Sequence, residues 1–316
     1  MRKGGYAMKH TSALLLLLAA LLVCTAALAA PIPLDSPDSL PETTADGFLP
    51  EGSEPVYYKD HEAGYWLYLD DTLRLEITRT KTSSPCLTYY TAEIILARGS
   101  SLYTVTYNPD HPGRTNGLPQ TMALSSHAVY AQSGDFYSYR VSHDRYPGSI
   151  VRDGRVLYKK TYSKVIDAIP NLATIAFFPS GKAEVNEAHE VSAAEYVERG
   201  ASTVMAFGPI LLRDGEMADL NKSEYNHLEP RSCFGVVGPN HFVGLLVEGR
   251  KKHSDGANLT TCAQILYDFG CTDAINLDGG NTAAMLFMGE SVQLAENGGV
   301  DENDRAIPDI LCAGTY

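Results

Sequence analysis

Alternation of apolar and polar residues predicts that most of the chain after residue 55 forms β-strands. Residues 73–79 alternate strictly and residues 65–69 more loosely, as half-buried strands do. Other short apolar or β-branched runs lie between turn residues. They predict further strands over 88–96, 102–107, 148–152, 155–158, 172–178, 204–212, 233–237, 241–248, 274–277, 285–288 and 310–313.

Helical spacing is confined to three stretches. Residues 122–130 predict a short helix that leads into a strand ending at residues 134–137. Residues 192–199 and 261–269 each begin with a capping-box pair, Ser192 with Glu195 and Thr261 with Gln264. Gly270 should end the last helix. We therefore expect an α+β fold, a mixed, largely antiparallel sheet with few helices, in which residues 241–277 could form one parallel β-α-β unit.

The N-terminal 30 residues form a predicted export segment. Basic residues precede an apolar core over 13–23, and residues 27–29 give a small-x-small cleavage pattern, which is typical of a signal peptide. An uncleaved signal anchor is the alternative, because the apolar stretch over 12–30 approaches membrane-spanning length. Residues 31–55 are rich in Pro, Ser, Asp, Glu and Thr and predict a disordered linker. The folded domain is expected over residues 56–316.

Composition and charge limit the classes of partner. With 44% hydrophobic and 20% charged residues, the 316-residue chain has an ordinary globular composition. Its net charge of −13 argues against nucleic-acid binding, which requires clustered Lys and Arg. Membrane contact is expected only through the N-terminal segment if it is uncleaved. The substrate should be neutral or attracted by local charge.

The cysteines give no metal or redox pattern. Of six, Cys24 lies in the export segment, and the other five leave at least one thiol unpaired or in an intermolecular bond. Cys262 and Cys271 could pair if the chain turns back, although both fit equally well as buried small hydrophobic residues.

Residues 274–285, Ala-Ile-Asn-Leu-Asp-Gly-Gly-Asn-Thr-Ala-Ala-Met, are the most informative segment. An apolar strand would bring Asp278 to a Gly-Gly turn, where the backbone can pass close to a ligand. An ordinary Asp-Gly turn between two strands would have the same local sequence. The surrounding sequence favours the functional interpretation.

The order of motifs resembles that of the phosphodiester glycosidase family. Segments 230–237 and 242–250 are followed by 254–259, a helix and the Asp-Gly-Gly turn, and further agreement lies upstream over 131–137, 148–158, 207–211 and 214–215. The resemblance is strongest over residues 90–315. It implies one catalytic domain of an exported hydrolase that cleaves a sugar from a glycosyl phosphodiester in a cell-envelope or extracellular glycan.

Three carboxylates are candidates for the chemistry of such a cleavage. Asp278 would act as nucleophile or base at the sugar. Asp135 would be a second carboxylate or an anchor for sugar hydroxyls, with Glu248 as its rival. Each also has a structural alternative, since Asp135 and Asp278 could cap turns and Glu248 could be a solvated hairpin residue.

The departing phosphate requires positive charge and hydrogen-bond donors. Arg231 and Arg250 are candidate clamps, because a guanidinium matches phosphate oxygens with two bonds, although either could be a surface ion-pair partner. Backbone N–H groups of the Gly-Gly turn could form an anion nest. The candidate substrate-binding residues are Arg250, Gly279, Gly280, Asn281, Thr282 and Ser254, the last of which could instead hold a turn.

Two departures from the family pattern leave other functions open. The chain has Ser133-Gly134-Asp135 where relatives usually have Asn-Gly-Asp, and Ala283 cannot hydrogen-bond through its side chain. A non-catalytic glycan-binding or scaffold protein of exopolysaccharide or envelope assembly is the alternative, and a transferase is a third possibility. No cofactor is required by these residues, and no spacing demands a divalent metal.

Overall fold

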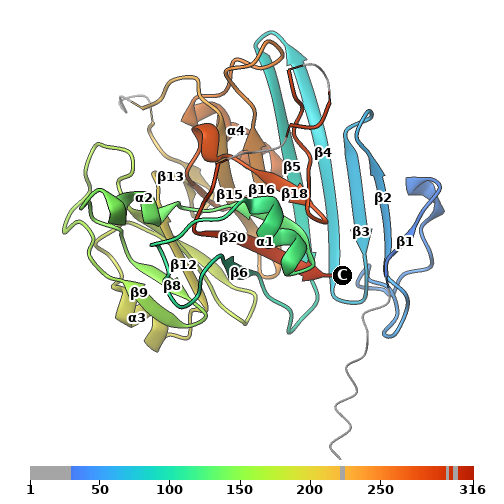
Figure 1. Cartoon of the computed structure of the whole chain (residues 1–316), viewed down its shortest axis with the longest axis horizontal. Coiled ribbons are helices and arrows are strands. Elements are labelled where there is room, and N and C mark those ends of the chain that lie inside the picture. The colour runs from blue at the N-terminus through green and yellow to red at the C-terminus, as the bar shows by residue number, and fades with distance from the viewer. Residues whose placement is uncertain (1–29, 221–224, 297–298, 302–304) are drawn as a thin grey trace, which may run out of the picture.

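Three β-sheets share one apolar core in the computed structural model, which describes residues 30–220, 225–296, 299–301 and 305–316 (Figure 1). The shared core draws buried side chains from all three sheets, such as Ile77, Ile175 and Met285. The described residues therefore form a single α+β domain, as predicted.

The large sheet runs through most of the molecule and supplies the strand that leads to Asp278. Its neighbours are antiparallel except for the first pair, β1 and β2, which is parallel. In spatial order the strands are β1 (Ile32–Pro33), β2 (Val56–Asp60), β3 (Tyr65–Leu69), β4 (Leu73–Ser83), β5 (Cys86–Leu96), β16 (His241–Val247), β15 (Arg231–Gly238), β17 (Asp273–Asn276), β13 (Ile210–Arg213) and β14 (Glu216–Met217).

The two smaller sheets are antiparallel throughout. One has the order β11 (Ala183–Asn186), β10 (Ala173–Phe177), β12 (Thr203–Phe207), β8 (Ile150–Arg152) and β9 (Arg155–Tyr158). The other has the order β19 (Glu290–Ser291), β18 (Met285–Phe287), β7 (Ala128–Ser133), β20 (Asp309–Thr315) and β6 (Tyr103–Thr106).

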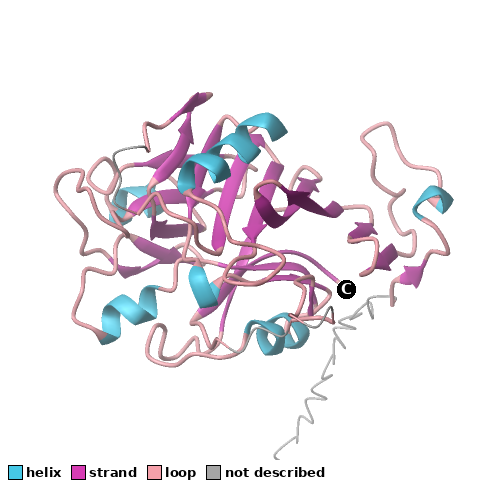
Figure 2. Cartoon of the chain, turned by 90° about the horizontal axis from the view of Figure 1, so that it is seen from above, coloured by secondary structure: helices cyan, strands magenta, loops and turns pink. Residues whose placement is uncertain are grey.

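The helices are short and lie outside the sheets (Figure 2). Among the described residues they are η1 (Pro37–Ser39), α1 (Pro119–Ser125), α2 (Tyr137–Ser142), α3 (Ala193–Glu198), α4 (Leu259–Phe269) and η2 (Gly280–Thr282). Alternation in β15 explains how α4 is held. Phe234 contributes to the central core, whereas its neighbour Cys233 packs with Leu266 of α4 on the opposite face of the sheet.

The prediction of one strand over 204–212 is wrong, because this segment forms β12 and β13 in two different sheets. Gly208, at φ +82°, and Pro209 separate the two strands. A Cβ at residue 208 would overlap the side chain of Asn171, so only glycine fits there. Pro209 has no N–H group to continue a ladder.

Three other predicted details also differ. β16 and β17 both pair with β15, so the 241–277 unit is not a directly paired parallel β-α-β unit. Helix α4 is capped by Asn258, whose side chain accepts from Thr261 N at 2.8 Å, and not by Thr261. After β7 the chain forms helix α2, where the end of a strand was predicted.

Residues 31–55, predicted to be a disordered linker, lie along the β2 edge of the large sheet. Leu34 N donates to Tyr57 O at 2.8 Å, and Leu49 is buried against β2 and β3. Two adjacent apolar residues in this polar segment, Phe48 and Leu49, are buried, and Leu49 holds the segment against the sheet. Residues 1–29 of the predicted export segment lie outside the described part of the chain.

All five cysteines after the export segment are free thiols, four of them buried. Cys262 and Cys271 therefore pack as small hydrophobic residues with the α4 cluster. None of the described helices combines the length and apolar character needed to span a bilayer.

Candidate active site

Asp278 is held where the ends of three strands meet. Beyond β17, Leu277 N donates to Ser232 O at 2.8 Å and Asp278 N donates to Gly134 O at 3.1 Å. The next residue, Gly279, lies so close to Pro230 that a Cβ would overlap Pro230 O. The glycine is thus required to bring the strand end against the backbone of its neighbour.

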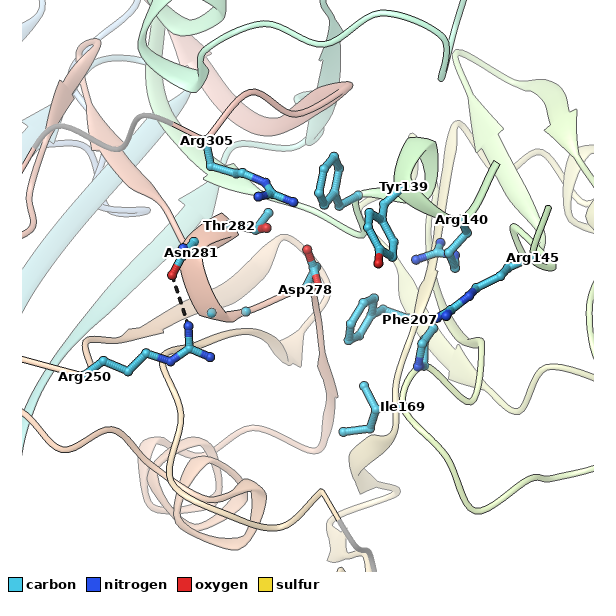
Figure 3. Close-up of a pocket in the computed structure, with 14 residues that line it drawn as sticks. Tyr139, Arg140, Arg145, Ile169, Phe207, Arg250, Asp278, Asn281, Thr282 and Arg305 are labelled. Atoms are coloured by element: carbon cyan, nitrogen blue, oxygen red, sulfur yellow. Dashed lines mark hydrogen bonds between the residues drawn. The ribbon is translucent and has the colours of Figure 1, made fainter. Parts of the chain in front are cut away.

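Asp278 lines a pocket of about 390 Å³ (Figure 3). Arginines reach it from several segments, and aromatic and apolar side chains form the side opposite the Gly-Gly turn. The lining residues are Phe136, Tyr139, Arg140, Arg145, Ile169, Pro170, Phe207, Arg250, Asp278, Gly279, Gly280, Asn281, Thr282 and Arg305. Asp278 is the single carboxylate among these described lining residues, so the pocket is locally positive in a protein of net charge −13.

The protein environment makes ionisation of Asp278 unfavourable. Burial raises the pKa of Asp278 to about 6, and the negative charge of Asp135 adds to this rise. A hydrogen bond with Thr282 and the charges of Arg140 and Arg305 act in the opposite direction without cancelling it. A carboxylate with this pKa is mostly ionised at pH 7 and can still accept a proton, which suits a general base.

Asp135 lies behind the pocket, in a buried ion network. Its side chain is fully buried, with Oδ1 accepting from Arg152 Nη2 at 3.0 Å and Oδ2 accepting from Ala206 N at 2.9 Å. Arg152 also donates through Nε to Asp309 Oδ2 at 2.7 Å. Asp135 does not line the pocket, in contrast to its predicted role as second carboxylate or sugar anchor.

Arg140 links this network to the pocket. Its guanidinium donates to Asp135 O at 2.7 Å, and to Pro147 O and Ala206 O at 2.8 Å each. Burial lowers the pKa of Arg140, while Asp135 and Asp278 partly offset that effect. The side chain therefore fixes the loop before α2 and presents positive charge behind Asp278.

Arg231 lies away from the pocket, in contrast to its predicted role as a phosphate clamp. The side chain is buried, and its guanidinium donates to Ala257 O at 3.0 Å, Tyr225 O at 3.0 Å and His227 O at 2.7 Å. These bonds tie together the segments before β15 and before α4. Arg231 thus has a structural role.

Glu248 and Ser254 belong to a second buried hydrogen-bonded cluster, which lies outside the pocket. Burial alone would raise the pKa of Glu248, but hydrogen bonds from Leu294 N, Tyr90 and His253 together hold it below its usual value. Ser254 Oγ donates to Glu248 O at 2.6 Å, which matches the turn-holding alternative for Ser254. Neither residue lines the pocket that contains Asp278.

The remaining predicted substrate-binding residues do come together. Arg250 is exposed, and it is held by Glu229 at 2.7 Å through Nε and by Asn281 Oδ1 at 3.1 Å through Nη1 (Figure 3). Its backbone has φ +60°, a left-handed conformation that costs energy for a non-glycine residue and often accompanies function. Gly280 N donates to Pro230 O at 2.8 Å, so this N–H group does not join the predicted anion nest.

Several pocket residues were absent from the sequence predictions. Arg140 and Arg145 come from α2 and the loop after it, and Arg305 approaches from the opposite side (Figure 3). The guanidinium of Arg305 also lies over the Phe136 ring, 5.3 Å from its centre. The one available sequence signal was that Arg140 follows Asp135 closely, since nothing local links residue 305 to residue 278. Within the described ranges, no group of three or more His, Cys, Asp or Glu side chains is arranged to hold a metal ion.

A family model places this pocket in a known group of proteins. The model that describes phosphodiester glycosidases matches residues 126–313, more than half of the chain, and its range contains Arg140, Asp278 and Arg305. The chain belongs to the phosphodiester glycosidase family. The resemblance inferred from the motifs is thereby confirmed.

The individual relatives of this family member are distant. The catalytic domain of zebrafish N-acetylglucosamine-1-phosphodiester α-N-acetylglucosaminidase, auto-inhibited by its pro-peptide, superposes with a TM-score of 0.60 at 19% identity, covering 78% of this chain and 84% of that one. A hypothetical protein from Synechocystis superposes with a TM-score of 0.51 at 12% identity. The match covers 84% of this chain and 64% of that one.

A relative found by sequence is an uncharacterised protein, YomE, derived from the SPbeta prophage of Bacillus subtilis (strain 168). It is 27% identical over 167 residues, which are 52% of this chain. The chain spans about a quarter of the length of that relative, since the match covers 25% of it.

Proposed function

We propose that the protein is an exported hydrolase that cleaves a sugar from a glycosyl phosphodiester. One observation carries the proposal: Asp278, with a pKa raised to about 6, is the single acid among the described lining residues of a pocket whose other charged groups are arginines. A phosphodiester brings an anion to the arginines and an electrophilic anomeric carbon to the carboxylate. A single substrate therefore supplies a group for the arginines and a group for Asp278.

The pocket suits a defined orientation of that substrate. The sugar packs against the aromatic side, where Tyr139 and Phe207 lie and where the centre of the Phe136 ring is 6.0 Å from that of Tyr139, because the apolar faces of sugar rings pack on aromatic rings. The phosphate lies on the side of the Gly-Gly turn, within reach of Arg250 and Arg305. Arg250 has five N–H donors, and its contacts with Glu229, through Nε and Nη2, and with Asn281, through Nη1, use three of them.

Asp278 acts in this proposal as a general base. Water attacks the anomeric carbon, Asp278 takes a proton from that water, and the bond from the anomeric carbon to the phosphate oxygen breaks. The electron pair leaves on the phosphate monoester, whose charge the arginines stabilise. Because a phosphate monoester is a good leaving group, no general acid is needed.

Single displacement is favoured over a covalent intermediate. A retaining double displacement needs a second group to activate water after the sugar is attached to the first carboxylate. Asp135 cannot fill that role, because Arg152 and Ala206 N occupy its two carboxylate oxygens. We therefore expect inversion of the anomeric configuration.

The site of action follows from the predicted export segment. Residues 1–30 have the pattern of a signal peptide or signal anchor, which would place the domain outside the cytoplasmic membrane. A phosphodiester-linked glycan of the cell envelope or extracellular matrix is the substrate class available there.

The test uses N-acetylglucosamine 1-phosphate methyl diester, chosen after the activity named for the zebrafish enzyme. Purified protein is incubated with the α and the β diester, and sugar release and product anomer are followed by proton NMR. We expect free sugar of inverted configuration, and Asp278→Asn should slow its release by about 10²–10⁴-fold. Asp268→Asn, at an exposed position on α4, is the matched control.

Three outcomes would contradict the proposal. Binding without release in either form would indicate a glycan-binding protein. Transfer of the sugar to an added alcohol in preference to water would indicate a transferase. Retention of configuration would make Asp278 a nucleophile and rule out the single-displacement step.

A further inference from the structure

A second cavity adjoins the candidate active site beyond Arg250 and Asn281. Its volume is about 240 Å³, and it shares Arg250, Gly280 and Asn281 with the Asp278 pocket. The hydrogen bond between Arg250 and Asn281 lies on the boundary between the two spaces. We call it the second cavity and define it by Glu248, Arg250, Lys251, Asn281, Gln293 and Asp301.

Gln293, which lines this cavity, carries an unused acceptor. The residue is only 7% exposed, and none of the described residues donates to its Oε1 atom. Its backbone is held at both ends, since Gln293 N donates to Ser291 Oγ at 3.2 Å and Asp301 N donates to Gln293 O at 2.9 Å. A buried polar atom without a partner is costly, so a ligand hydroxyl that donates to it would relieve that cost.

The cations around the second cavity are already paired. Lys251 has three N–H donors, and it binds Glu248 at 2.9 Å, Leu294 O at 2.7 Å and Asp301. Arg250 is paired with Glu229. The cavity therefore offers acceptors, Gln293 Oε1 and the half-exposed Asp301 carboxylate, and no unpaired positive charge among its defining residues for a second phosphate.

We infer that the second cavity binds the alcohol on the far side of the phosphodiester, and that this alcohol is a neutral polyol such as a sugar or glycerol unit. The inference rests on the proposed function, which places the phosphate beside Arg250. Hydroxyl groups can donate to the acceptors that the cavity presents. Its volume is below the roughly 300–1,000 Å³ of pockets for drug-sized ligands, which limits the occupant to one small unit.

The order of groups across the two spaces matches such a substrate. In the first pocket the aromatic side chains, Asp278 and the turn with Arg250 follow one another (Figure 3), and Gln293 lines the second cavity, which shares Arg250 with that pocket. Sugar, anomeric carbon, phosphate and polyol follow in the same order along a glycosyl phosphodiester. The enzyme would thus select its substrate at both ends of the phosphate.

Binding to a non-hydrolysing variant tests this inference separately from catalysis. In the Asp278→Asn background, calorimetry gives the Kd of N-acetylglucosamine 1-phosphate methyl diester and of the corresponding glycerol diester. We expect the glycerol diester to bind about 3–10-fold more tightly, the value of one hydrogen bond of ordinary strength. Gln293→Leu should abolish this ratio.

Two further variants serve as controls. Gln264→Leu makes the same chemical change at an exposed position of α4 and should keep the ratio. Gln293→Met, which is unbranched, replaces Gln293→Leu if the latter does not fold. Circular dichroism of each variant shows whether the fold is intact.

The outcomes distinguish the two proposals. Equal affinity for both diesters, or a preference that survives replacement of Gln293, overturns the inference. Hydrolysis of the methyl diester by the unaltered protein supports the proposed function whatever the ratio is. If the glycerol preference depends on Gln293 but no diester is hydrolysed, the inference holds and the hydrolase proposal fails. If neither diester binds, both fail.

Discussion

Replacing Asp278 with Asn should make the protein more stable at neutral pH. The carboxylate is half-buried, and burial is the largest effect on its pKa, which rises from 3.8 to about 6. A rise of about two pKa units corresponds to about 3 kcal/mol, by which the folded protein prefers the neutral side chain. Asparagine is neutral at every pH, and its Oδ1 can still accept a hydrogen bond from the Thr282 hydroxyl.

The sign of the pH dependence follows from the direction of the shift. Between pH 3.8 and about 6 the folded protein holds a proton on Asp278 that the unfolded chain has lost. The free energy of unfolding of the unaltered protein therefore falls as the pH rises through this window. The advantage of Asp278→Asn should be near zero below pH 4 and reach its full value, up to about 3 kcal/mol, above pH 7.

Urea unfolding of both proteins from pH 4 to pH 8 measures this difference. Trp66 is the only tryptophan and is buried in the central core, so its fluorescence reports loss of the fold. Asp268→Asn, on the exposed face of α4, should change stability by less than about 0.5 kcal/mol. A stability gain that does not vary with pH, or a loss at pH 8, would refute the assignment of Asp278 as an unfavourably buried acid.

Three further predictions separate binding residues from framework residues. Asp135→Asn should cost about 3 kcal/mol of stability in urea unfolding, opposite in sign to Asp278→Asn, because it removes a charge partner of the buried Arg152; an unchanged midpoint would contradict this. Arg250→Ala should raise KM about 10–100-fold while changing stability by less than about 1 kcal/mol, because its exposed pair with Glu229 adds little to folding; kinetics and unfolding together decide it. Arg231→Lys should lower stability by about 1–3 kcal/mol with KM retained, because lysine cannot satisfy the same carbonyl groups; a selective rise in KM would instead place Arg231 at the substrate.

Local pattern was enough to predict most elements and the Gly-Gly turn that lines the pocket. Some elements depend only on residues that are neighbours in sequence, so the sequence alone predicts them. They are the alternating strand β4, the hairpin of β15 and β16, and the end of α4 at a glycine. The turn at Asp278 belongs to the same group, because its glycines make the close backbone approach possible. Residues 204–212 were wrongly predicted as one strand because each half has a typical strand sequence. Only the pairing in the two sheets shows that the strands are separated at Gly208.

Roles of charged side chains could not be predicted in this way, because the folded backbone and partners distant in sequence decide them. Nothing near Arg231 in sequence shows that its guanidinium faces carbonyl groups of segments 225–227 and 257. Likewise, Asp135 is occupied by Arg152 and by the backbone of residue 206, from two other strands. The arginine at 305 reaches the pocket only because the chain returns beside β7.

The contrast between the two aspartates shows how the site is built. Asp135 is the more deeply buried, yet its two oxygens have charged or backbone partners, so its charge is compensated by the framework. For Asp278, the cost of burying the charge is only partly offset. The charges of Arg140 and Arg305 act on the carboxylate, but its pKa stays raised. Those arginines could have been placed to pair with Asp278 fully, which would have lowered its pKa and left it a weak base. Their incomplete compensation keeps Asp278 basic enough to take a proton from water. The stability lost at Asp278 and the positive charge of the pocket lining therefore belong to one arrangement, which a phosphodiester substrate would complete.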